Sequence, residues 1–167
     1  MIDCSRAFSF PSLSASIFCP EHKIPSANAL SRRGISVPDT SCHLCPGGLD
    51  ETDHFLVMCP FVKQVLTWIA DLCKVTLPQF NSVNDLVKFA AVWGNCRKKR
   101  KTWIALVYGL LWCTWKARNE KAFNRKNTSV SNLADNVLTT VFSWVKHRGK
   151  IGNVSWAEWI CDPMNIV

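Results

Sequence analysis

The sequence predicts a mainly α-helical fold, in which a small Cys/His module precedes a bundle of about three to four helices. Apolar residues recur at spacings of three and four in several segments after residue 60, which is the period of a helix with one buried face. Three cysteines and one histidine lie within 18 residues and are separated by turn-forming residues. We therefore divide the chain into a poorly ordered segment 1–22, a module 23–73 and a helical region 74–167.

Two short helices are expected within the module. The first covers residues 26–33, where Gly34 follows as a typical helix-ending glycine. The second covers residues 54–58, with Thr52 or Asp53 as its N-cap. A module of this size has a thin apolar core, and domains of that kind commonly rely on a bound metal.

Four longer helices are expected in the remainder, over residues 61–73, 82–93, 97–123 and 129–147. The third is apolar nearly all round at its centre, so other helices should cover it. The last carries a clear apolar stripe on one face. After it come the aromatic and apolar residues that we expect to dock on the bundle: Trp156, Trp159 and Ile160.

Positive charge is concentrated in one part of the sequence. The chain has a net charge of +8, and residues 97–150 alone contain 13 Lys/Arg against 2 Asp/Glu. A local excess of this kind suits phosphate backbones, because each neutralised phosphate releases counterions. We interpret the densest run as a candidate nucleic-acid-binding site, with a solvated helix face that doubles as a nuclear localisation signal as the alternative. The run consists of Arg97, Lys98, Lys99, Arg100 and Lys101.

Cysteine usage and hydropathy indicate where the protein resides. Nine cysteines, an odd number without a regular spacing, indicate a reducing compartment in which thiols stay free, so we expect an intracellular protein, nuclear or cytoplasmic. The longest apolar run, residues 103–115, is 13 residues long, whereas a membrane-spanning helix needs about 20. We therefore expect no membrane partner.

The motif that carries chemistry is Cys42-x2-Cys45-x8-His54-x4-Cys59. It supplies three thiolates and one imidazole, a set that a tetrahedral structural zinc uses. All four positions would be filled by protein, which leaves no open position for water or substrate. The pattern therefore predicts one structural Zn²⁺ ion and no catalytic metal. Stripping this metal should disorder residues 40–60, while the helices after residue 80 should stay largely helical.

The spacing within the motif carries a geometric condition. Positions 54 and 59 are five residues apart, about 140° around a regular helix, so they could share a metal only if the helix is interrupted. Pro60 provides that interruption, because a proline disfavours helical backbone at the residue before it.

Other interpretations of these residues stay open. The three cysteines could be small buried hydrophobes and His54 a satisfied core histidine. His43 could compete as a ligand, although its side chain should point out of the turn. Cys45 or Cys59 could also be a nucleophile with His54 as its base, but no Asp or Asn is placed to orient that histidine. The remaining cysteines in helical stretches are expected to be packing residues: Cys73, Cys96 and Cys113.

Three segments together resemble the zinc-binding region of reverse transcriptases from plant non-long-terminal-repeat retrotransposons. The first is Ile24-Pro-Ser-Ala-Asn-Ala-Leu-Ser-Arg-Arg-Gly-Ile35. The second is the Cys/His motif with its companions Glu51-Thr-Asp-His-Phe-Leu56 and Cys59-Pro-Phe61. The third is Leu111-Trp-Cys-Thr-Trp-Lys-Ala-Arg-Asn-Glu-Lys-Ala-Phe123, which is similar to the family's W-x-x-W-x-x-R-N helix.

The resemblance implies a non-catalytic zinc module that contacts RNA or DNA, and other retrotransposon-type proteins as further partners. It implies zinc ligation by Cys42, Cys45, His54 and Cys59. It gives no position a catalytic role, since the adjacent aspartates of the polymerase and the residues of the endonuclease and RNase H are missing, so we expect no enzyme. A zinc-stabilised protein-interaction module and a functionless element remnant are the alternatives. The residues that match the downstream helix are expected to be core tryptophans and an Arg–Asn pair: Trp112, Trp115, Arg118 and Asn119.

Overall fold

The structure, a computed structural model, describes residues 24–148 and 154–165, so the segment 1–22 predicted to be poorly ordered lies outside it. The described residues form seven helices and no strand, which confirms the predicted mainly α fold. The helices are α2 (Ala27–Arg32), η1 (His54–Met58), α3 (Pro60–Leu72), α4 (Val83–Val92), α5 (Arg97–Asn124), α6 (Val130–Arg148) and α7 (Trp156–Cys161).

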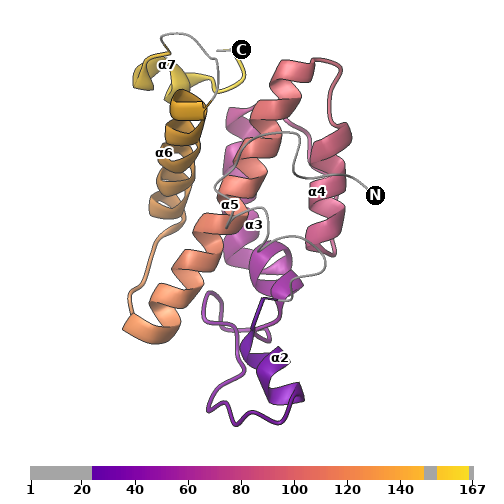
Figure 1. The fold of residues 1–167 in the computed structure, drawn as a ribbon, viewed down its shortest axis with the longest axis vertical. Coiled ribbons are helices and arrows are strands. Elements are labelled where there is room, and N and C mark those ends of the chain that lie inside the picture. The colour runs from indigo at the N-terminus through magenta and orange to yellow at the C-terminus, as the bar shows by residue number, and fades with distance from the viewer. Residues whose placement is uncertain (1–23, 149–153, 166–167) are drawn as a thin grey trace.

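Helix α5 is the centre of the bundle. It packs against α6, α4, α3 and η1, as its apolar sequence predicts (Figure 1). α6 lies alongside it, while α2 lies at the end of the molecule opposite to α7. Gly109 allows the close contact between α5 and α6, because a Cβ at this position would lie 2.3 Å from Cγ2 of Val141.

Several of these helices are capped by serines at positions 26, 82 and 129, where the sequence predicts that helices begin. The Oγ atoms of Ser26, Ser82 and Ser129 accept hydrogen bonds from backbone N–H groups three residues further on, at 3.1 to 3.2 Å. Asp53, one of the two expected residues, is the N-cap residue of the 54–58 helix, but its side chain does not cap this helix. Asp53 makes no such bond there, and its Oδ1 instead accepts the N–H of Val83, which joins η1 to the start of α4.

The C-terminal segment docks on the bundle as expected, and it does so as a helix that the sequence analysis did not predict. Ser155 and Glu158 form a reciprocal capping box at the start of α7. Trp159 is completely buried and its Nε1–H donates to the carbonyl oxygen of Leu138 at 3.0 Å. Ile160, by contrast, is 40% exposed and contributes little to this docking.

The hydrophobic core runs through the whole described chain. One cluster of buried side chains extends from Ile24 in the module to Met164 after α7. Within the described residues, no helix is both long and apolar enough to span a membrane. The Cys/His segment is thus packed directly onto the helical bundle.

Candidate metal centre

The first two cysteines of the motif lie in a loop whose ends are held together. Ser41 and Leu49 form an isolated antiparallel bridge, and the N–H of Cys42 donates to the carbonyl oxygen of Gly48 at 2.7 Å. Cys45 lies within this closed loop. The turn between the two cysteines therefore starts from a fixed backbone position.

The second ligand pair depends on an unusual turn. The N–H of Cys59 donates to the carbonyl oxygen of His54 at 2.7 Å, a bond that spans five residues instead of the four of an α-helix. This π-helical turn brings residues five apart toward the same side. At Cys59 the backbone leaves the helix (φ −56°, ψ 129°), as expected before Pro60. The predicted interruption is therefore present, and the wider turn before it was not predicted.

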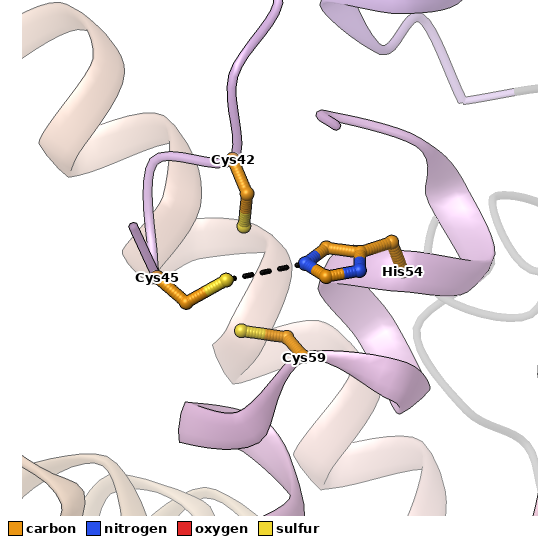
Figure 2. Close-up of side chains that lie close together, drawn as sticks. All are labelled: Cys42, Cys45, His54 and Cys59. Atoms are coloured by element: carbon orange, nitrogen blue, oxygen red, sulfur yellow. Dashed lines mark hydrogen bonds between the residues drawn. The ribbon is translucent and has the colours of Figure 1, made fainter. Parts of the chain in front are cut away.

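These two segments bring four side chains to one point, as Figure 2 shows. The Sγ atoms of Cys42, Cys45 and Cys59 and a ring nitrogen of His54 all lie within 4.8 Å of one another. The distance from the Cys45 Sγ to the His54 Nε2 is 3.3 Å. In a tetrahedron with Zn–S bonds of 2.3 Å the sulfurs are about 3.8 Å apart, so separations of at most 4.8 Å are of the order that a bound metal ion requires.

A hydrogen bond within the cluster shifts the pKa values of two of its cysteines in opposite directions. A hydrogen bond from the Cys59 thiol lowers the pKa of Cys42 to about 5. The same bond, together with burial, raises the pKa of Cys59 well above its ordinary value. Cys42 is thus ready to bind as a thiolate at neutral pH, whereas a metal must displace the proton of Cys59, as thiolate ligation generally requires.

Gly48 positions the histidine. An added Cβ at Gly48 would lie 2.2 Å from both Nε2 and Cε1 of the His54 ring, so only glycine lets the ring lie against the loop backbone. A Cβ added at Gly47 would have no atom within 4 Å. The two neighbouring glycines therefore differ in function. Gly48 leaves room for the imidazole of His54, whereas Gly47 only forms part of the turn.

The other interpretations of the motif fit less well. His43 is outside the cluster of potential ligands. Cys45 and His54 do form a thiol–imidazole pair, but two further sulfurs converge on the same point. In the part of the chain that the structure describes, no carboxylate or amide side chain hydrogen-bonds to the His54 ring. A catalytic thiol–imidazole pair needs such an orienting group, whereas a four-ligand metal site needs three sulfurs and one imidazole nitrogen close together, which the structure provides.

The remaining cysteines divide into two kinds. Cys73 and Cys113 are buried, and burial raises the pKa of both thiols, that of Cys73 to about 12, so they are packing residues as predicted. The prediction is wrong for Cys96. It is exposed and serves as the N-cap of α5, where the N–H groups of Lys99 and Lys98 lower its pKa.

A buried ion pair joins the metal segment to the centre of the bundle. Asp50 is completely buried, and both of its carboxylate oxygens accept hydrogen bonds from Arg118 of α5, one of them from Nε at 3.0 Å. Asp50 also accepts the backbone N–H of Ala27 at 2.7 Å, at the start of α2. Asp50 is not among the site residues predicted from the sequence, because its partner is 68 residues away.

Arg118 contacts both ligand-bearing segments. Besides Asp50, which follows the cysteine loop, its guanidinium lies 5.6 Å from the ring centroid of the buried Phe55, next to His54. Its Nη1 donates to Oδ1 of Asn119 at 2.9 Å, which is the expected Arg–Asn pair. The two tryptophans of the same motif stack on each other and pack against the core: Trp112 and Trp115.

The candidate nucleic-acid run is not uniform. Arg97, Lys98 and Lys99 are exposed at the start of α5. Arg100 is half-buried and donates from Nε to the carbonyl oxygen of Trp93 at 2.9 Å, so it holds the turn between α4 and α5. Lys101 is half-buried too. Only the first three side chains of the run are freely displayed to a ligand.

We expect loss of one ligand to abolish stoichiometric zinc binding. Cys59→Ser replaces a buried sulfur ligand by a hydroxyl, which is a poor zinc ligand, and should leave less than one zinc per chain by elemental analysis. Cys73→Ser changes a buried cysteine outside the cluster and should retain one zinc. Equal zinc loss in the two variants would refute the ligand assignment.

Gly48→Ala should weaken zinc binding by tenfold or more, on the order of what loss of a ligand-orienting contact causes. The added methyl group displaces the His54 ring from the three sulfurs. Competition with a chromophoric chelator measures the affinity, and Gly47→Ala is the control because its methyl group meets open space. Equal affinities of the two variants would contradict the positioning role of Gly48.

Asp50→Asn should lower the free energy of unfolding by about 3–5 kcal/mol, because it leaves the buried Arg118 without a counter-charge. Adding Arg118→Met should restore part of this loss. Glu51→Gln breaks the exposed pair with Arg32 and should change stability by about 0–1 kcal/mol. Urea denaturation of the zinc-loaded protein provides these values, and a similar loss for the Asp50 and Glu51 variants would contradict the role of the buried pair.

Comparison of the chain with known proteins gives no match: no protein-family model matches it, and no curated protein or solved structure is similar enough to count as a match. The resemblance to retrotransposon reverse transcriptases therefore stays a prediction from the three motif segments.

Proposed function

We propose that this chain is a zinc-stabilised, non-catalytic accessory module of the reverse-transcriptase type, which binds RNA or DNA. The observation that carries the proposal is the closed set of four ligands, three sulfurs and one imidazole nitrogen within 4.8 Å. A metal held by four protein ligands has no position for water or substrate, which suits a structural role. The family motifs are consistent with this reading, because they surround the same four residues.

The nucleic-acid part of the proposal is supported by charge. The net charge is +8, and Arg97, Lys98 and Lys99 are exposed together at the start of α5. Cations at a helix N-terminus oppose the helix dipole, so the run is unfavourable for the helix itself. A phosphate backbone would relieve this repulsion, and its binding would release counterions.

The proposal predicts salt-sensitive binding at micromolar protein. Gel shifts of the zinc-loaded chain with single-stranded RNA and DNA of one sequence, at two salt concentrations, measure it. Lys98→Ala/Lys99→Ala should weaken binding and lower the slope of log K against log salt by about 1.4, since each lost phosphate contact of a single strand contributes about 0.7.

The control for charge is Lys63→Ala/Lys88→Ala, which removes two exposed lysines on α3 and α4 and should leave binding nearly unchanged. A blank polymerase assay is expected of the same preparation. Failure of the wild-type chain to bind either nucleic acid in a salt-dependent way would overturn the proposal.

A further inference from the structure

A small pocket lies beside the cysteine loop, at the end of α5 that is far from Arg97. Its volume is about 70 Å³. Pockets that hold a whole small molecule have about 300–1,000 Å³, so this one accommodates a single group of a larger ligand. The residues that line it are Leu44, Phe61, Ala117, Lys121, Lys126 and Thr128.

The apolar side of the pocket is built from three separate segments. Leu44 comes from the turn between the two cysteines of the metal loop, Phe61 from the first turn of α3 and Ala117 from α5. All three are half-buried and pack against the hydrophobic core. Because Leu44 lies within the metal loop, the pocket has its shape only when that loop is folded.

The polar side is formed where α5 ends. Arg125 adopts left-handed backbone (φ 54°), and its N–H donates to the carbonyl oxygen of Lys121 at 3.1 Å. The N–H of Lys126 donates to the carbonyl oxygen of Glu120 at 3.2 Å. This capping turn reverses the chain, so that residues 126 and 128 line the same pocket as Lys121.

The charges around the pocket select the class of ligand. Two lysines, Lys121 and Lys126, and Thr128 are among the six residues that line this one small opening. Within the described residues neither Lys121 nor Lys126 forms an ion pair. The only acidic residue between positions 97 and 134 is Glu120, whose carboxylate accepts a hydrogen bond from Asn124. Such a pocket suits an anionic group with several acceptor oxygens.

We propose that this pocket binds a phosphodiester group of an RNA or DNA strand. The inference rests on the proposed nucleic-acid binding and adds a second contact to it. Lys98 and Lys121 are 23 residues apart on α5, which is about 35 Å along the helix at 1.5 Å per residue. The basic residues that follow one another in the sequence would therefore provide two separate phosphate contacts, one at each end of α5. The second contact, at Lys121, adjoins the metal loop.

The test compares two pairs of lysines by the same salt titration with single-stranded RNA. Lys121→Ala/Lys126→Ala should lower the salt slope by about 1.4 and weaken binding several-fold, whereas Lys63→Ala/Lys88→Ala should not. Ala117→Leu fills the pocket without changing charge and should weaken binding as well. Far-UV circular dichroism and zinc content check that each variant is folded and loaded.

The outcomes separate this inference from the proposed function. If the wild-type chain does not bind nucleic acid, both are overturned. If it binds and the Lys121/Lys126 variant retains the wild-type slope, or Ala117→Leu binds normally, only the pocket is refuted. If the lysines instead offset the net negative charge of a Cys₃His zinc centre, the Lys121/Lys126 variant will lose zinc to a chelator more readily while binding RNA as before, which also refutes the pocket.

Discussion

The contact on which the rest of this structure depends is the buried pair between Asp50 and Arg118. Asp50 lies in sequence between the two ligand pairs, after the cysteine loop and before His54. Arg118 lies on α5, which contacts the three other long helices, α3, α4 and α6. Its guanidinium pairs with Asp50 and also lies over the ring of Phe55. One guanidinium thus fixes the segment that connects both halves of the metal site to the centre of the fold.

This arrangement explains why the metal site and the bundle depend on each other. A buried ion pair stabilises little by itself, but removing one partner leaves an uncompensated charge in the core. If the cysteine loop unfolds, Asp50 moves away from Arg118, and the buried guanidinium is left without a counter-charge. The expectation that the helices after residue 80 keep their structure without metal therefore needs one addition: their secondary structure can persist, but their stability should fall.

Much of the fold could be predicted because it is encoded locally. Helix starts at Ser26, Ser82 and Ser129 depend on bonds that span three residues, and the four ligands lie within 18 residues. What could not be predicted depends on distant partners. Asp50 looks like an ordinary loop aspartate until α5 places Arg118 against it. The π-helical turn at His54 was not predicted either, because Pro60 indicates where the helix is interrupted but not that the turn before it is wider.

The most direct test of the account is X-ray absorption at the zinc edge on protein purified without chelator. The account predicts a first shell of three sulfurs at about 2.3 Å and one nitrogen at about 2.0–2.1 Å, with no bound water. A shell of nitrogen and oxygen atoms only, or protein that contains no zinc, would contradict it.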